Sequence, residues 1–293
     1  LTRINRAIEL GAFFENRALC DAVDAAKGHT LHLFGLVSDG CVHSSLDHLY
    51  AVLELARRRG ANDVALHAFT DGRDTPPHSG PGFLRAVAAK MRDIGVGRIA
   101  TVSGRYFAMD RDKRWDRVLR AFEAIAFGRG RAGDDRFLFS EGDEFIEPTV
   151  IGGGAPVLDD DSILFFNFRA DRARELTRAF TDAAFAEFVV TGRPTRIKYT
   201  TMTSYDKTFA LPVAFPPQDL SGLLGEIVAA AGLAQFRVAE TEKYAHVTYF
   251  FNGGREEPYA YEDRILVPSP RDVATYDLKP EMSAAEVTRE LAA

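Results

Sequence analysis

The amino-acid sequence predicts an α/β protein in which helices cover a mostly parallel sheet, followed by a smaller second domain. Three observations lead to this fold class. Apolar runs of strand length alternate with amphipathic segments of about 10–15 residues, which is typical of βα units. Turns rich in Gly and Pro separate these segments. The alternation ends after about residue 230, so we place a boundary between residues 217 and 232 and assign 1–228 and 229–293 to the two domains.

Each element of the first domain follows from local composition. Residues 46–59 carry apolar side chains at helical spacing. Residues 163–168 form an apolar strand, and a helix starting directly after it would place Arg169 and Arg172 on one face. In chain order we expect helical residues 2–26, strands at 30–37, 64–69, 98–102, 163–168 and 195–202, helices at 46–59, 82–94 and 113–127, and loops at 70–77 and 128–160.

The second domain is expected to be richer in strands. Ser283 and Glu286 form a capping box that predicts the start of a last helix. The sequence begins with leucine, and this last helix has no stop signal before Ala293, so we expect an internal piece of a longer protein. The expected strands are residues 235–239, 245–251 and 264–268, with a tight turn at 252–254.

Composition limits the classes of function. The net charge of −6 argues against a nucleic-acid-binding protein, because such proteins carry a basic excess and often interleave exposed aromatic residues with arginines. No apolar run reaches the roughly 18 residues of a membrane span, and no signal peptide opens the sequence. Cys20 and Cys41 form neither a disulfide framework nor a metal-type pair. We expect a cytoplasmic monomer that acts on a small anionic molecule, without nucleic-acid or membrane partners.

Charged residues follow the predicted strands at the point where each strand ends. Ligands bind at this edge of open α/β sheets. Five arginines and a histidine gathered there would repel one another without an anion, and arginine binds carboxylate and phosphate in a bidentate manner. This favours a ligand carrying both groups over the alternative of ordinary solvated charge pairs. The residues are Ser38, Asp39 and His43, then Asp71, Arg73 and Asp74, then Arg105, Asp110, Arg111 and Lys113, and finally Arg169 and Arg172.

Other patterns offer neither a nucleophile nor a metal site. Dinucleotide-binding, P-loop and zinc-protease motifs are absent from the sequence. The seven histidines never pair at metal spacing, and we expect His32 and His67 to be packing residues of strands. Cys41 is a candidate nucleophile only by residue type, and a small buried thiol is the simpler interpretation. No serine lies in a strand–turn–helix elbow or beside an evident base.

Seven long segments follow one another along the chain: FGLVSDGCVHS, HAFTDGRDTPP, SGRYFAMDRDKRWDRV, FFNFRADRARE, TMTSYD, ETEKYAHVTYFFNGG and EDRILVPSPRDVATYDLKPEMSAAEVT. In this order they resemble the cofactor-independent phosphoglycerate mutase family. This family interconverts 3- and 2-phosphoglycerate through a phosphoserine intermediate, in glycolysis and gluconeogenesis. The resemblance implies an inserted phosphotransferase domain that binds the substrate, and part of an alkaline-phosphatase-like domain that holds two manganese ions.

The resemblance also implies substrate contacts, residue by residue. Asp74 is the candidate catalytic residue, which would handle the proton of the glycerate hydroxyls. Lys243 would contact the phosphoryl group from the phosphatase side. Near His43, where the family has a second glycine and a second histidine, this chain has Cys41 and Ser45. The implied substrate contacts are His43, Arg73, Asp74, Arg105, Arg111, Arg169, Arg172 and Lys243, of which all but Lys243 also belong to the strand-end set.

In the family, the nucleophilic serine and the metal-binding Asp and His residues lie outside the segment present here. We therefore expect the chain to carry the substrate clamp without nucleophile or metal ligands, and to be inactive alone. The alternative is a non-catalytic phosphoglycerate-binding module derived from that enzyme. A reading frame that extends in both directions and supplies the serine and the metal ligands would distinguish the enzyme from the module.

Overall fold

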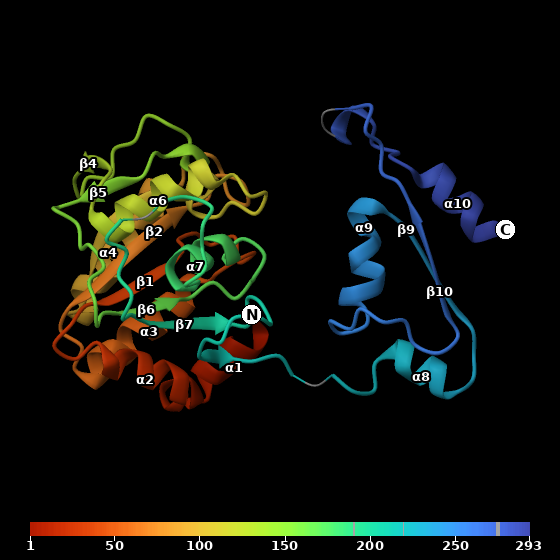
Figure 1. The fold of residues 1–293 in the computed structure, drawn as a ribbon, viewed down its shortest axis with the longest axis horizontal. Coiled ribbons are helices and arrows are strands. Elements are labelled where there is room, and N and C mark those ends of the chain that lie inside the picture. The colour runs from red at the N-terminus through yellow and green to blue at the C-terminus, as the bar shows by residue number, and fades with distance from the viewer. Residues whose placement is uncertain (190, 219, 274–275) are drawn as a thin grey trace. The chain divides into compact units, whose positions relative to one another are not determined.

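The computed structural model of this chain describes residues 1–189, 191–218, 220–273 and 276–293. Figure 1 shows the fold as a ribbon. The chain divides into two compact units, Leu1–Pro217 and Gln218–Ala293. This division lies at the N-terminal end of the interval expected from the sequence and ahead of residue 228. Helix α8 (Leu224–Ala230) accordingly belongs to the second unit.

The first unit is built on an eight-stranded sheet with the order β4-β5-β3-β2-β1-β6-β7-β8. Neighbouring strands are parallel except β3 and β5, which are antiparallel. The predicted class, a helix-covered and mostly parallel sheet, is confirmed. The strands are β1 (Leu31–Leu36), β2 (Val64–Thr70), β3 (Arg98–Gly104), β4 (Arg131–Gly133), β5 (Thr149–Ile151), β6 (Ser162–Phe165), β7 (Lys198–Thr203) and β8 (Val213–Phe215).

Helices cover both faces of this sheet, which explains why every residue of its central strands β1, β2 and β6 is buried. Leu33 of β1 packs on one face with α2, α3 and α4, whereas the next residue, Phe34, packs on the other face with α6 and α7. Both side chains are fully buried. The helices of this unit are α1 (Thr2–Glu9), α2 (Arg17–Ala25), α3 (Leu46–Arg59), α4 (Gly80–Ile94), α5 (Arg105–Ala108), α6 (Trp115–Phe127) and α7 (Arg174–Thr181), with 3₁₀ turns at Ala12–Glu15 and Asp143–Phe145.

The prediction that a helix begins directly after residue 168 was wrong. Strand β6 ends at Phe165, and α7 begins only at Arg174. Arg169 and Arg172 therefore lie in a turn and not on one helix face. The carbonyl of His43 binds the amides of Phe168 and Arg169, which holds this segment against the loop after β1 and keeps it from starting a helix. The composition of residues 169–174 favours a helix and gives no sign of this hydrogen bond to a distant loop.

The second unit is smaller and contains a two-stranded parallel sheet. The predicted strand at 245–251 was wrong, because these residues continue α9 as a π-helical turn at His246–Phe250. Thr248 Oγ1 donates to the carbonyl of Tyr244 at 2.7 Å, and this local bond supports the helical path despite the strand-like composition. The elements of this unit are α8, β9 (Gln235–Glu240), α9 (Thr241–Ala245), β10 (Glu262–Val267), a 3₁₀ turn at Tyr276–Leu278 and α10 (Ala284–Ala292).

The remaining expected strands are close to those observed, and three short strands were not predicted. β4, β5 and β8 have three residues each, too few to show an alternating pattern. The sequence predicted a loop over the regions of β4 and β5. In the ranges that the structure describes, no helix combines the length and apolar character needed to cross a membrane.

Candidate functional site

The predicted site residues of the first unit follow four strands that are neighbours in the sheet, β3, β2, β1 and β6. From β1 the chain proceeds through β2 to β3, while β6 pairs with the other side of β1, so the strand order reverses there (Figure 1). Ligands bind in the crevice that such a reversal leaves beyond the carboxyl ends of the strands. His43 lies at this point. Its backbone bonds with Phe168 and Arg169 join the loops after β1 and β6.

Arg105 connects three of the predicted site loops, and its side chain is only 3% exposed. Nη1 donates to Asp71 Oδ1 at 2.6 Å and to Asp74 Oδ2 at 2.5 Å, and Nη2 lies 2.9 Å from His43 Nε2. Because a guanidinium only donates hydrogen bonds, His43 Nε2 accepts and its neutral ring carries the proton on Nδ1. Burial and, next, the charge of Arg105 lower the pKa of His43 to about 4. His43 is therefore neutral at pH 7.

Asp71 fixes the turn that carries Arg73 and Asp74. One of its carboxylate oxygens accepts a hydrogen bond from Ser38 Oγ at 2.7 Å, and the other accepts from the amides of Arg73 and Asp74 at 3.2 and 2.9 Å. Burial raises the pKa of Asp71, but the Asp74 amide, Ser38 and Arg105 outweigh it and hold the pKa below its usual value. The Asp-Gly-Arg-Asp pattern is the sequence signal for such a turn, although we had not assigned Asp71 to the substrate contacts.

Asp171 joins three predicted site residues. Its Oδ2 accepts a hydrogen bond from Arg111 Nη1 at 2.9 Å, and its Oδ1 lies 3.0 Å from Arg169 Nε. His43 Nδ1, which carries the ring proton, is 3.7 Å from the same Oδ1. Asp171 was not among the predicted site residues. The structure places it between two arginines of the predicted clamp.

Arg172 is half-buried in a positively charged surrounding. Its Nη1 donates to the carbonyl of Met109 at 3.1 Å. Burial lowers the pKa of Arg172, and the charges of Arg111, Arg105 and Arg73 lower it further. The Arg73 side chain is 55% exposed and thus accessible to a ligand. Arginines from the ends of three strands, β2, β3 and β6, therefore act on one region, where an anion would be stabilised.

Lys243, the remaining predicted contact, belongs to the second unit. It lies on α9 and its side chain is exposed. The two units are described separately, so the contact between Lys243 and a phosphoryl group stays a prediction. The sequence signal for Lys243 was its place in a family motif and not a strand end.

The loop after β1 keeps a defined path with Cys41 and Ser45. Cys41 has φ +52°, a left-handed conformation that costs residues with a Cβ roughly 1–2 kcal/mol and that glycine adopts freely. Ser45 Oγ accepts from the amide of Asp47 at 3.3 Å and caps α3. The expectation that Cys41 is a buried thiol was wrong, because it is exposed. The loop nevertheless holds His43 buried, at 2% exposure.

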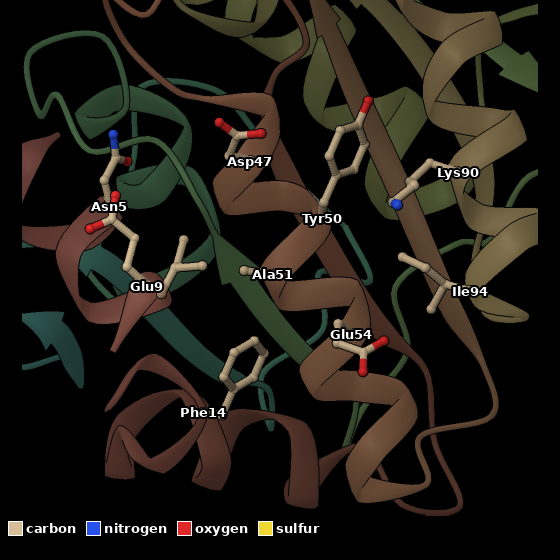
Figure 2. Close-up of a pocket in the computed structure, with 10 residues that line it drawn as sticks. Asn5, Glu9, Phe14, Asp47, Tyr50, Ala51, Glu54, Lys90 and Ile94 are labelled. Carbon is tan, nitrogen blue, oxygen red and sulfur yellow. The ribbon is translucent and has the colours of Figure 1, made fainter. Parts of the chain in front are cut away.

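A groove elsewhere on the first unit has a different character. It measures about 510 Å³, and Figure 2 shows it between α1, α3 and α4. Glu9, Asp47 and Glu54 line it together with Lys90, so its charge would disfavour an anion. The eight predicted site residues, all of which the structure describes, do not line this groove. It is therefore not the expected phosphate site.

Comparison with known proteins identifies the family. The family described as "BPG-independent PGAM N-terminus (iPGM_N)" matches residues 4–207. The chain belongs to this family. A 2,3-bisphosphoglycerate-independent phosphoglycerate mutase of Syntrophotalea carbinolica is 54% identical over 300 residues, and one of Moorella thermoacetica is 56% identical over 304 residues. Each alignment covers 98% of this chain but 58% of the relative, so the chain spans less than two thirds of the length of these mutases.

A solved phosphoglycerate mutase shares the fold. The enzyme of Leishmania mexicana, whose crystal structures were determined at low cobalt concentration, superposes with a TM-score of 0.74 at 32% identity. The match covers 98% of this chain and 56% of that mutase. Among the residues described for our chain, no group of three or more His, Cys, Asp or Glu side chains could hold a metal ion. These residues therefore do not fit the manganese pair that the resemblance implies, and we derive no step through a metal.

Proposed function

We propose that this chain is the substrate-binding part of a 2,3-bisphosphoglycerate-independent phosphoglycerate mutase, which interconverts 3- and 2-phosphoglycerate through a phosphoserine intermediate. One observation carries the proposal: arginines from three strand ends lie near a neutral histidine from a fourth, at the reversal of strand order. The phosphate and carboxylate of phosphoglycerate would offset the repulsion among these arginines. Each charge-assisted hydrogen bond contributes roughly 1.5–3 kcal/mol.

The contacts of the clamp suggest distinct roles. Arg172 and the exposed Arg73 are suited to bind phosphate. Among the residues that the structure describes, Arg172 donates to a carbonyl and to no carboxylate, and Arg73 lies 3.6 Å from the Glu144 carboxylate. Arg111 and Arg169 are bound to Asp171, and a ligand carboxylate would compete with it for them. His43 Nδ1 would donate its proton in a hydrogen bond to a ligand oxygen.

We assign proton transfer at the glycerate hydroxyls to Asp74. Its Oδ2 is bound by Arg105, so the proton would be accepted at Oδ1. Lys243 would contact the phosphoryl group from the second unit. The nucleophilic serine and two manganese ions would belong to other parts of the complete enzyme, a cytoplasmic monomer of glycolysis and gluconeogenesis. The chain as given would then bind phosphoglycerate without turning it over.

Calorimetry and an activity assay on the purified chain test this proposal. We expect 3-phosphoglycerate to bind, and to bind more weakly as salt is added, because exposed charges are screened. Inorganic phosphate and glycerate should each bind more weakly, since each engages one part of the clamp. We expect no mutase turnover with manganese. If the chain does not bind 3-phosphoglycerate, the clamp is contradicted. If the chain itself turns the substrate over, the proposal that the nucleophile and the metal ligands belong to other parts of the enzyme is contradicted.

A non-catalytic phosphoglycerate-binding module is the second candidate. The arginine clamp would serve binding alone as well as it would serve turnover. The encoding reading frame distinguishes the two candidates. A frame that supplies the serine and the metal ligands on either side supports the enzyme, and one without them supports the module.

A further inference from the structure

The loop that carries Arg111 is tied to the segment that carries Arg169 and Arg172 at three points. Arg172 Nη1 donates to the carbonyl of Met109 at 3.1 Å, and Arg111 Nη1 donates to Asp171 Oδ2 at 2.9 Å. The third tie is a hydrogen bond between Glu175 and the loop, and it involves none of the clamp arginines. The first two involve clamp arginines, which a ligand can draw away from these partners. The third tie remains when the clamp is engaged.

Glu175 lies in the first turn of α7 and is 8% exposed. Its Oε1 accepts a hydrogen bond from the amide of Lys113 at 2.8 Å. Lys113 has φ +59°, a left-handed conformation that is unfavourable for a residue with a Cβ. The bond from Glu175 holds the backbone of Lys113 in this conformation. The loop of Arg111 therefore depends on α7 for its path.

Asp110 completes this arrangement from the loop side. It is 4% exposed, and its Oδ2 accepts from the amides of Asp112 and Arg114, both at 2.9 Å. Arg117 of α6 lies 3.5 Å from its Oδ1. Asp110 thus organises the loop internally, while Glu175 anchors it to α7.

The second oxygen of Glu175, Oε2, is buried and has no hydrogen-bond partner among the described residues. Burial is the main cause that raises the pKa of Glu175 to about 7; the neighbouring carboxyl of Asp110 and the charge of Asp112 contribute to this rise, while the Lys113 amide acts against it. The charged groups that face this site are therefore Asp110 and Asp112 from the loop, with Arg117 of α6 bound to Asp110. A neutral Glu175 removes the repulsion between two buried carboxylates, whereas its ionisation restores it.

We propose that Glu175 is a positioning residue of the clamp, which holds the Arg111 loop in its binding conformation while its carboxyl is protonated. This inference rests on the proposed function, because the ligand whose binding it controls is phosphoglycerate. Loss of the proton leaves two negative charges side by side in a buried place, and the loop separates from α7. Affinity for phosphoglycerate therefore decreases as the pH rises through neutrality, beyond any change that the ligand's own phosphate causes.

Glu175→Gln tests this directly, because glutamine is neutral at all pH values and keeps an oxygen for the Lys113 amide. Calorimetry with 3-phosphoglycerate at about pH 6 and about pH 8 should show a wild-type affinity that decreases roughly 3- to 10-fold more than that of Glu175→Gln. Glu175→Ala should bind more weakly than Glu175→Gln at both pH values. The matched control is Glu187→Gln, which removes an exposed carboxyl and should follow the wild-type profile.

A second measurement needs no ligand. Amide hydrogen exchange of Lys113, corrected for the intrinsic pH dependence, should accelerate in the wild-type chain between these pH values and stay unchanged in Glu175→Gln. Parallel wild-type and Glu175→Gln profiles in exchange and binding would overturn the inference. Failure of the wild-type chain to bind phosphoglycerate at either pH contradicts the proposed function instead, and the exchange data then still decide whether Glu175 holds the loop.

Discussion

The two units of the chain differ in how completely they bury their apolar side chains. In the first unit, helices cover both faces of the sheet, and each face has its own fully buried cluster. In the second, β9 and β10 form a two-stranded sheet, which is marginal by itself. Ala239 and Val267 are its buried apolar side chains among the described residues. The large apolar side chains exposed there are Leu220, Leu224, Ile227, Leu233, Phe236, Phe250, Phe251, Tyr261, Leu266, Leu278 and Leu291.

This difference bears on how the predicted contacts are held. A binding site is accurate when its residues are fixed by packing and by hydrogen bonds behind them. The strand-end residues have this support, as the buried ion pair of Arg105 with Asp71 illustrates. Lys243 lies in the unit whose apolar surface is largely exposed, and such a surface is typical of an interface. The predicted contacts of the first unit are therefore held by packing and hydrogen bonds, whereas the predicted contact Lys243 lies on an exposed helix with less such support.

The two units should differ most in the unfolding free energy that is lost when one aromatic side chain is truncated in each. Phe34 is fully buried, so Phe34→Ala should lower the free energy of unfolding by about 3–5 kcal/mol. Phe236 is 40% exposed, and Phe236→Ala should cost less than about 1 kcal/mol. Urea unfolding followed by circular dichroism measures both. Similar losses would show that the second unit buries more than its side-chain exposure indicates.

Ion pairs should give a contrast of nearly the same size. Asp71→Asn leaves the buried charge of Arg105 with weaker compensation, and we expect a loss of up to about 3–5 kcal/mol in unfolding free energy. In the second unit, Asp272 pairs with Lys279 at an exposed position, and Asp272→Asn should leave stability nearly unchanged. The same unfolding experiment measures both variants. If Asp71→Asn leaves the unfolding free energy unchanged, the role of Asp71 in fixing the turn is contradicted.

Acid should destabilise the first unit through its buried histidines. Burial, followed by the charge of the N-terminal amine, lowers the pKa of His48 to about 4. The unfolded chain, with a histidine pKa of about 6.5, then binds more protons, so stability is complete above about pH 6.5 and falls towards pH 4. The full loss from His48 is roughly 3 kcal/mol, since each pKa unit corresponds to about 1.4 kcal/mol.

His48→Gln should therefore flatten the decrease of unfolding free energy between about pH 6.5 and pH 4. Buried His43 and His67, whose pKa values are also lowered first by burial, act with the same sign and leave part of the slope. His246→Gln, at an exposed position of the second unit, is the control and should keep the wild-type profile. An unchanged slope in His48→Gln would refute this assignment.

The smallest effects are expected in ligand binding. Arg172→Ala and Arg169→Ala should each weaken 3-phosphoglycerate binding by roughly 10- to 150-fold, equivalent to about 1.5–3 kcal/mol. Arg178 lies on the same helix as Glu175 but pairs with Asp182 at the surface, so Arg178→Ala should be nearly neutral. Lys243→Ala should have less effect than either clamp variant. Calorimetry measures the affinity loss of each variant. An Arg172→Ala variant that binds 3-phosphoglycerate as tightly as the wild-type chain would contradict the clamp assignment.

Much of the first unit could be predicted because its signals are local. Strands were expected at 30–37, 64–69 and 98–102, and β1, β2 and β3 overlap these ranges. The strand-end arginines were found by the same reasoning, since strand ends can be located without knowing the partners of their side chains. By contrast, residues 245–251 have a strand-like composition but adopt a helical path, because nearby helical contacts outweigh propensity.

The sequence by itself determined the alternation of strands and helices, the family, and which charged residues follow the strands. Only the tertiary structure decided which acids hold these charges. Arg105 and Asp71 are separated by 34 positions, and Arg111 and Asp171 by 60. Periodicity reports neighbours one or two turns apart and carries no information on such pairs. The turn at 169–173 was decided in the same way, because the carbonyl that fixes it belongs to His43, on a loop from another strand.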